Sequence, residues 1–245
     1  MGSADLYLSE MHRRFGYLAT WLPNAPIAVG DVGVLRRDGF DREASISDFG
    51  IDVAAESATK PVDLEYCTTG CVETAFNMSA EQHLLPNGPQ GTVDVTFTRE
   101  DAVLFVATAC FPTAIIDVRA LGRRALELYN AGDWKPQWAV VTEVVDSHSS
   151  TIVIAEQAGA KLKLSARLAI ASSLISLADA RAGLSIESAR GLSTRILAAE
   201  GLRPLFRVHG VRRGILRQPG FERKARPNDK AKPIDFIQLS DSDRI

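Results

Sequence analysis

The sequence of 245 residues is poor in cysteine, with three in the whole chain. So few cysteines exclude a scaffold held by disulfides, and their odd number is typical of a reducing, intracellular compartment. A chain of this length can bury a sizeable core without cross-links or metals. We therefore expect one large cytoplasmic domain, with or without an appendage.

Long apolar runs are absent as well. No window of the sequence approaches the length of a membrane-spanning helix. The first fourteen residues, MGSADLYLSEMHRR, contain no apolar core of the signal-peptide type, and Leu6 stands where a myristoylation motif needs Ser or Thr. The sequence thus predicts a protein that could enter a membrane only by refolding or as amphipathic strands.

Catalytic motifs are also missing. The sequence has no P-loop, nucleophile elbow or His-Glu-x-x-His pattern, and GDVGV at 30–34 has too few glycines for a dinucleotide fingerprint. Asp146, Ser147 and His148 are adjacent, whereas the members of a catalytic triad converge from separate segments. We interpret 146–150 as a hairpin turn and predict a protein that is not an enzyme and binds no cofactor.

The cysteines do not form a metal motif. Cys67 and Cys71 are four residues apart with His83 downstream, but a structural zinc site needs four ligands, usually as two close pairs. The second pair is missing. We therefore expect no metal and free thiols, with Cys110 in the core.

Charge is divided unevenly along the chain. The net charge is −2, yet residues 203–245 contain eleven basic and five acidic residues, against seventeen basic and twenty-five acidic residues in 1–202. A basic tail can bind an acidic partner, anionic lipid or its own body. The acidic body and the few aromatics in the tail argue against nucleic acid as a partner.

Apolar periodicity predicts a strand-rich α+β fold with a mostly antiparallel, twisted sheet and a few flanking helices. Helices are expected at 4–16, after a cap at Asp117, and as a short helix at 192–201. The strands that we expect are these: 27–34, 46–53 with a bend at Gly50, a strand pair or one bulged strand at 62–66 and 72–76, a hairpin of 92–98 with 103–111, a hairpin of 138–145 with 151–156, a third strand at 160–168, and strands within 183–191 and 203–216. Residues 169–182 fit a helix or a strand.

The end of the chain divides into two segments after a domain at 1–216. Residues 217–233 are basic and proline-rich, which predicts an exposed linker, and Arg217, Arg223, Lys224 and Arg226 suit a trypsin-like protease. The tail at 234–245 begins with IDFIQL. Its large apolar side chains are costly to leave in water, which predicts docking on the body through Ile234, Phe236, Ile237 and Leu239. Docking could restrain the body, or it could simply complete the core.

The order of elements resembles the pore-forming domain of gasdermins in their compact bacterial form. The resemblance rests on a helix before IAVGDVGVL, on strands through GFDREASISDFGIDV and GTVDVTFTREDAVLFVA, and on the helix RALGRRALELYNAG before AVVTEVVDSHSSTIVIAEQAGAKLKL. It implies a twisted antiparallel sheet whose strands lengthen into membrane hairpins after a protease removes an inhibitory C-terminal segment. It also implies an anionic membrane, an activating protease and a homo-oligomer as partners. The family's acylated N-terminal cysteine has no counterpart, since the first cysteine is Cys67.

The segment AKLKLSARL carries positive charge on one face of an apolar strand. Lys161, Lys163 and Arg167 alternate with leucines. In a membrane barrel the basic face could line a pore or meet anionic head groups, whereas in a soluble sheet one face simply packs on the core. The alternative function is therefore a soluble protein- or ligand-binding module with a static β-rich core and a basic C-terminal interaction tail.

Overall fold

A computed structural model describes most of the chain, which folds as two compact units. The first unit consists of 1–7, 59–111 and 147–202, and the second of 8–58, 112–146 and 203–245. The residues that the structure describes are 3–21, 26–36, 39–78, 91–166, 173–212 and 219–224.

The fold is α+β and strand-rich, with antiparallel sheets, as predicted. The helices are α1 (Ser3–Phe15), α2 (Val118–Ala131) and the 3-10 helices η1 (Ile46–Phe49), η3 (Leu174–Ala178) and η4 (Ala180–Ala182). The strands are β1 (Leu18–Ala19), β2 (Asp31–Leu35), β3 (Phe40–Ser45), β4 (Ala55–Ser57), β5 (Val62–Cys67), β6 (Val72–Met78), β7 (Gly91–Phe97), β8 (Val103–Ile115), β9 (Trp138–Ala155), β10 (Ala160–Ala166), β11 (Ser185–Arg190), β12 (Leu192–Glu200), β13 (Leu205–Arg212) and β14 (Gly220–Arg223).

The two α-helices begin and end where the sequence predicts. The Asp117 side chain accepts a hydrogen bond from the backbone N–H of Ala120 at 2.7 Å, which caps the N-terminus of α2. Gly132 ends α2 in the left-handed region, at φ +89°, where glycine has no steric penalty. Gly16 takes the corresponding place after α1, at φ +66°.

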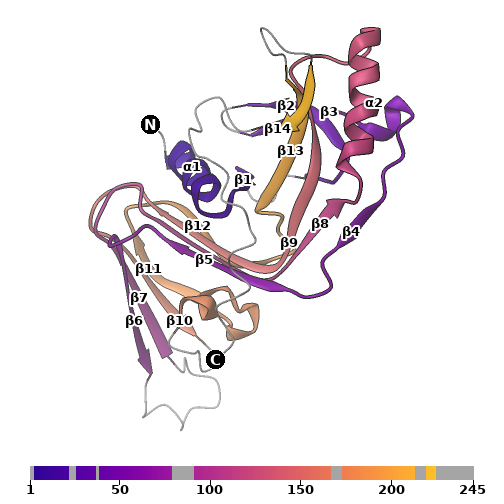
Figure 1. Ribbon diagram of the computed structural model, residues 1–245. Coiled ribbons are helices and arrows are strands. Elements are labelled where there is room, and N and C mark those ends of the chain that lie inside the picture. The colour runs from indigo at the N-terminus through magenta and orange to yellow at the C-terminus, as the bar shows by residue number, and fades with distance from the viewer. Residues whose placement is uncertain are drawn as a thin grey trace, which may run out of the picture. The chain divides into compact units, whose positions relative to one another are not determined.

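The second unit is built on the first half of β9. Antiparallel strands follow in the order β1-β13-β9-β2-β3, and β14 extends the sheet beyond β13. The helix α2 contacts β13 and β14 (Figure 1). Its stripe of Leu121 and Ala125 is buried against a cluster that includes Trp134 and Trp138. This unit therefore has an ordinary helix-on-sheet core.

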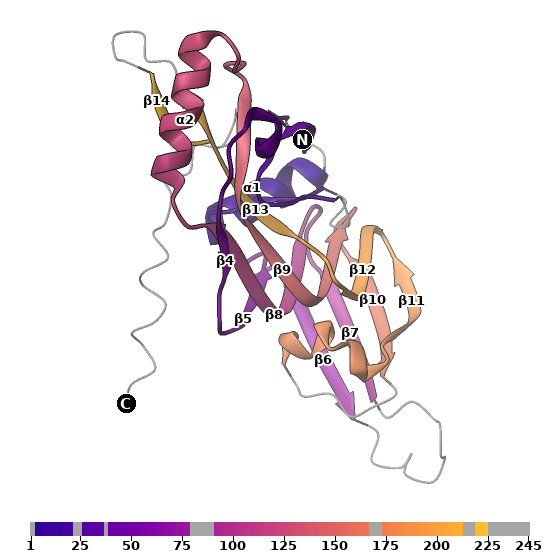
Figure 2. The same ribbon diagram turned by 90° about the vertical axis from the view of Figure 1, so that its right-hand side faces the viewer.

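The first unit contains two sets of strands that share one core. In one set, β5 pairs with β8, β8 with β9, and β9 with β12. In the other, four antiparallel strands follow in the order β11-β10-β7-β6 (Figure 2). Apolar side chains from both sets and from η3 and η4 form one buried cluster. We call the second set the four-stranded sheet.

Two predicted pairings are wrong. Strands β7 and β8 were expected to form a hairpin, but β7 pairs with β6 and β10, whereas β8 pairs with β4, β5 and β9. Residues 62–66 and 72–76, expected to form a strand pair or one bulged strand, are likewise divided between the two sets. Alternation reports which face of a strand is buried and carries no information about its neighbour, so both errors have the same origin.

The turn that we expected at 146–150 is also absent. Residues 138–155 form one strand, β9, whose central hydroxyl side chains are buried. Serine-rich segments favour turns because their hydroxyls can bond the local backbone. Here the Ser147 and Thr151 hydroxyls donate instead to the carbonyls of Leu202 and Leu177 in other segments, so the strand continues.

Two further predictions of local structure are wrong. Residues 192–200 form β12 and pair with β9, although their composition suggested a short helix. The segment 46–53, expected to be a strand, begins with η1, which ends at Gly50 at φ +66°. In the ambiguous region, residues 174–178 and 180–182 are 3-10 helices.

Candidate functional site

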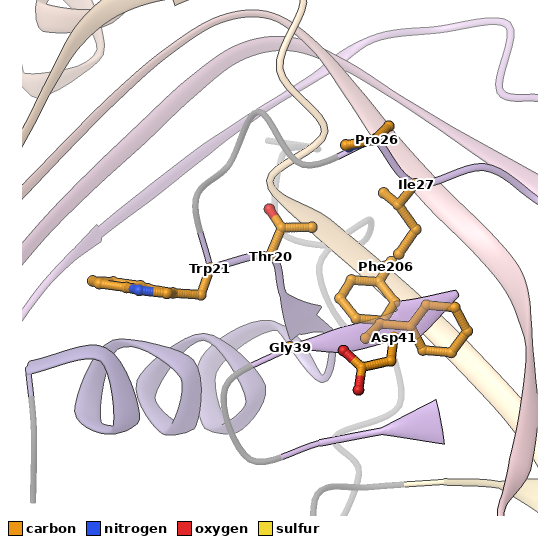
Figure 3. A pocket seen from close by; sticks show the side chains of 8 residues that line it. Thr20, Trp21, Pro26, Ile27, Gly39, Asp41 and Phe206 are labelled. Atoms are coloured by element: carbon orange, nitrogen blue, oxygen red, sulfur yellow. The ribbon is translucent and has the colours of Figure 1, made fainter. Parts of the chain in front are cut away.

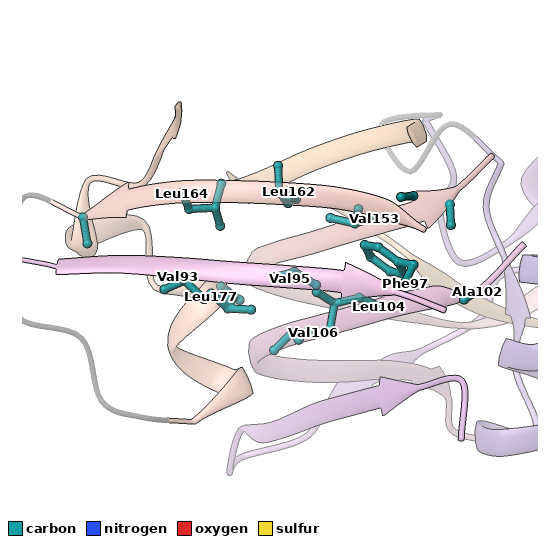
Figure 4. Close-up of a cluster of buried hydrophobic side chains, with 14 of the residues drawn as sticks. Val93, Val95, Phe97, Ala102, Leu104, Val106, Val153, Leu162, Leu164 and Leu177 are labelled. Carbon is teal, nitrogen blue, oxygen red and sulfur yellow. The ribbon is translucent and has the colours of Figure 1, made fainter. Parts of the chain in front are cut away.

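The four-stranded sheet is amphipathic across its width. Along β7, Val93, Val95 and Phe97 are buried, and the side chains between them are partly exposed. Along β10, Leu162 and Leu164 are buried in the same way. Leu162 pairs with Val95 and Leu164 with Val93, so the apolar side chains of the two central strands gather on one face (Figure 4).

A cover of short helices and neighbouring strands keeps this apolar face from solvent. Leu177 and Ala178 of η3, Ala182 of η4, Leu104 of β8 and Val153 of β9 are buried in the same cluster. Together with the face itself they form a continuous core within the first unit. The apolar face is therefore in contact with protein in the described state.

Thr151 connects the cover to the strands beneath it. Its hydroxyl donates a hydrogen bond to the carbonyl of Leu177 at 2.5 Å and accepts one from the backbone N–H of Ala198 at 2.8 Å. The side chain of Thr151 is fully buried. One hydroxyl thus ties η3 to both β9 and β12, a role that no feature of the sequence indicates.

The opposite face of the sheet is polar and carries the predicted basic residues. Lys161 is exposed. Lys163 forms an ion pair with Glu187 at 2.9 Å, and this hydrogen bond and the charge of Glu187 raise the pKa of Lys163. Arg167 lies outside the described residues. The structure therefore places two of the three predicted cations on one polar face, one of them neutralised by a neighbour that the sequence did not reveal.

The set of β5, β8, β9 and β12 contains two β-bulges with the same hydrogen-bonding pattern. Thr108 and Ala109 of β8 stand opposite Asp63 alone, and Ala109, at φ +46°, donates its N–H to Asp63 Oδ1 at 2.8 Å. Ala198 of β12 is left unpaired opposite Thr151, at φ +42°. In each bulge a side chain on the partner strand accepts the freed N–H. Such conformations are costly for alanine and mark these positions as strained.

The adjacent Asp146, Ser147 and His148 do not form a catalytic triad. The Asp146 carboxylate pairs with Arg203 at 2.6 Å, and the Ser147 hydroxyl bonds that of Ser150 at 2.7 Å. His148 is exposed. Asp146 and Ser147 are thus each engaged with a partner outside this trio, and the geometry offers no nucleophile and base in contact.

The cysteines are free thiols. Cys110 is fully buried, as predicted, and burial raises its pKa to about 12. Burial, followed by the charge of Glu65, raises the pKa of Cys67 to about 11. Among the described residues no group of three or more potential metal ligands occurs, and His83 lies outside them. Thiols with raised pKa values are poor nucleophiles and poor metal ligands.

The segment after β13 belongs to the second unit and packs on α2 and β13. A Cβ at Gly122 in α2 would lie 2.9 Å from the Phe221 ring, so only glycine admits the ring there. Phe221 also stacks on His209 with ring centroids 5.9 Å apart. Lys224 donates to the carbonyls of Trp138 at 3.0 Å and Pro136 at 3.2 Å, beside Gly210.

This packing bears on the predicted linker and cleavage sites. Arg223 belongs to β14 and Lys224 is half-buried, so this part of 217–233 differs from an exposed tether. Arg217, Arg226 and the predicted docking residues Ile234, Phe236, Ile237 and Leu239 lie outside the described residues.

Buried charges cluster beside this segment. Glu143 accepts hydrogen bonds from the Tyr17 hydroxyl and from Arg207, the latter at 2.7 Å, and the Arg207 guanidinium lies 3.8 Å from the Tyr17 ring centroid. Burial and Glu143 raise the pKa of Tyr17. Burial, then Arg223 and Arg207, lower the pKa of His209 to about 4. Glu143 thus has both Tyr17 and Arg207 as partners. The lowered pKa keeps His209 uncharged near neutral pH, with its Nδ1 2.8 Å from the Thr142 hydroxyl.

A cavity of about 280 Å³ opens in the second unit. Figure 3 shows Trp21, Ile27 and Phe206 around it, with Thr20 and Asp41 as polar groups. The Thr20 hydroxyl donates to the carbonyl of Arg203 at 3.0 Å, and Asp41 pairs with Arg36 at 2.8 Å. Its polar groups are thus occupied by the protein itself, and we assign it no ligand.

No helix in the described part of the chain is both long and apolar enough to cross a membrane. No protein-family model matches the sequence, and no curated protein matches it. Among solved structures the chain is similar to a bacterial gasdermin from Bradyrhizobium tropiciagri, with 14% identity over 92% of this chain and 93% of that chain, at a TM-score of 0.36. At this TM-score and identity the likeness assigns no function to the chain.

Proposed function

We propose that the protein permeabilises membranes by turning the apolar face of its four-stranded sheet toward lipid. The observation that carries the proposal is the alternation of β7 and β10, which places large apolar side chains on one face and polar ones on the other. Transmembrane strands need this division between a lipid face and a polar lumen. The proposed activity requires no catalytic group, in keeping with the expectation of a non-enzymatic protein.

The length of the alternation also supports membrane insertion. A tilted strand needs about 9–11 residues to cross the hydrocarbon layer. β10 has 7 residues, but in the sequence the alternation of Ala160, Leu162 and Leu164 continues through Leu168 and Ile170. Lengthening β10 into this sequence would give it the required span. Lys161, Lys163 and Arg167 would then all belong to the polar, lumen-facing side.

The apolar face has two favourable environments, its present cover and lipid. Fully burying a large aliphatic or aromatic side chain is worth about 1.5–3 kcal/mol relative to exposing it. Phe97, Leu162 and Leu164 alone would make an uncovered face unstable in water. We propose that separation from η3 and η4 is coupled to entry into an anionic membrane and to homo-oligomer formation.

The C-terminal segment is the proposed restraint. Trypsin-like cleavage at Arg217 or Arg226 would release the tail that contains Ile234, Phe236, Ile237 and Leu239. Arg223 and Lys224 are poorer sites, because a protease needs extended, accessible chain and these residues are packed in and beside β14. The protein would thus be cytoplasmic until an activating protease releases it.

The test compares two cuts in the full chain. One variant carries a specific protease site after Arg226, which frees the tail and retains β14, and the other carries it after Arg217, which frees β14 as well. Dye release is measured from vesicles of phosphatidylcholine with phosphatidylglycerol, before and after cleavage. We expect release only after cleavage, and none from vesicles of phosphatidylcholine alone.

The alternative, a binding module with a static core and a basic tail, makes the opposite prediction. Such a module would release no dye in either form. If both cuts leave the vesicles intact, the proposed function is wrong. If only the cut after Arg217 is active, the restraint lies in β14 rather than in the apolar tail.

A further inference from the structure

The four-stranded sheet has two open edges. Within the described residues, β6 pairs only with β7, and β11 pairs only with β10. Each outer strand therefore presents one row of backbone N–H and C=O groups without a strand partner. In hydrocarbon every such group must be hydrogen-bonded, at a cost of several kcal/mol for each one left unpaired. An inserted sheet must consequently pair its edges.

The two edges are complementary in direction. All three pairings within the sheet are antiparallel, so β6 and β11 run in opposite directions. If the β6 edge of one copy lies beside the β11 edge of the next, the antiparallel alternation continues through the junction. A second copy of this chain thus fits either edge without changing the strand pattern.

The edges are also complementary in charge. On the polar face one cross-strand row runs from Glu73 on β6 through Thr96 and Lys161 to Arg190 on β11. Glu73 and Arg190 are both exposed, and none of the ion pairs among the described residues involves either of them. Glu187, the one acidic residue of β11, is paired with Lys163. One edge therefore carries a negative charge and the other a positive charge at the same level.

We propose that Glu73 of one copy pairs with Arg190 of the next and so selects head-to-tail association between copies through β6 and β11. This inference rests on the proposed function, because lipid is what requires the edges to be paired. Joining two β6 edges, or two β11 edges, would bring together charges of the same sign. The charge pattern thus favours the heterologous pairing, which can propagate, over a closed two-fold dimer.

Charge reversal tests the proposal in the full chain, cleaved on vesicles of phosphatidylcholine with phosphatidylglycerol. Glu73→Lys gives two basic edges and Arg190→Glu two acidic edges, so each variant alone should need about tenfold more protein to form cross-linkable oligomers. An equal mixture of the two variants restores an opposite-charge pair at every junction. The mixture and the double variant should both associate like the wild type.

The matched controls are Glu127→Lys and Arg124→Glu on α2. They reverse the same charge types at an exposed ion pair on a helix of the second unit, which contributes no strand to the four-stranded sheet. Both controls should associate like the wild type. Far-UV circular dichroism of the uncut proteins shows whether each variant is folded. Single reversals that associate normally, or a mixture that is no better than its components, would overturn the proposal.

Two readouts separate this inference from the proposed function. If the wild type releases dye and the single reversals release it equally well, edge pairing by these residues is wrong and membrane permeabilisation stands. If the wild type forms oligomers with the predicted charge pattern but releases no dye, the pairing stands and permeabilisation is wrong. A wild type that neither associates nor releases dye after cleavage contradicts both.

Discussion

The two units are each stabilised by a different kind of internal contact. In the second unit, the rings of Phe49, Trp134 and Trp138 lie 5.2–5.4 Å apart, centroid to centroid. Glu43 accepts hydrogen bonds of 2.8 Å from both Lys135 and the Trp138 indole. In the first unit, mostly aliphatic side chains pack around Phe97, alanines at positive φ occupy two bulges, and the Thr151 hydroxyl connects η3 with β9 and β12.

This difference indicates which unit could rearrange. Interlocking aromatic rings and charge pairs have strict geometry, so they stabilise one arrangement. Aliphatic faces pack against a cover or against lipid with similar ease, because the hydrophobic effect is not directional. We infer that the second unit is the scaffold and that the first unit contains the part that moves. The following predictions test this division.

The largest effect is expected from the core beneath the four-stranded sheet. Phe97→Ala removes a fully buried ring from β7 and should lower the free energy of unfolding by about 3–5 kcal/mol. Phe97→Leu keeps most of the volume and is the control. Hydrogen exchange should quicken in β7 and β10 but not at 139–145 of β9. Uniform loss of protection in both units would contradict the division.

A smaller loss is expected at the hydroxyl that holds η3. Thr151→Val keeps the shape but leaves the Leu177 carbonyl and the Ala198 N–H without their partner, which should cost about 1–3 kcal/mol. Thr151→Ser retains the hydroxyl and should recover most of this loss. Chemical denaturation measures both. If the cover is the restraint on the sheet, the valine variant should also release dye faster after cleavage, and an unchanged rate would argue against that role.

Local features of the fold could be predicted from the sequence. The cap at Asp117 and the stop at Gly132 are local signals, and both were predicted correctly. The alternation along Leu162 and Leu164 also predicted the buried face of β10. Each depends only on neighbours in the chain and on which side chains avoid water.

The errors arose where distant segments decide the structure. The serine run of β9 looked like a turn because its partners, such as the Leu202 carbonyl for Ser147 and the Leu177 carbonyl for Thr151, are more than twenty residues away. The same holds for β12, which is a strand because β9 lies beside it. For the candidate site, the sequence identified the basic face but neither Glu187 nor the cover.

The second unit should respond to acid through His209. Burial and two arginines hold its folded pKa at about 4, below the value of 6.5 for a free histidine. Between these values the unfolded chain binds more protons, so stability should fall as pH drops from about 6.5 to 4. The full shift would correspond to about 3 kcal/mol, and because His209 is only partly buried and solvent screens its charge we expect about 1–2 kcal/mol. His209→Gln should flatten this part of the profile, and His148→Gln, at an exposed site, is the control. An unchanged profile in His209→Gln would show that another group is responsible.

The smallest effect should have the opposite sign. Ala198 adopts φ +42° in the bulge of β12, a conformation that costs alanine about 1–2 kcal/mol and costs glycine nothing. Ala198→Gly relieves this strain but also raises the conformational entropy of the unfolded chain, which lowers the free energy of unfolding by about 0.4–1 kcal/mol. The variant should therefore be more stable than the wild type by about 0.5–1 kcal/mol in chemical denaturation. Ala198→Val, whose branched side chain tolerates positive φ still less, should be less stable. Because relief of the strain stabilises the folded strand, the glycine variant should also release dye more slowly after cleavage. Unchanged or faster release would show that strain in the bulge does not favour rearrangement of the first unit.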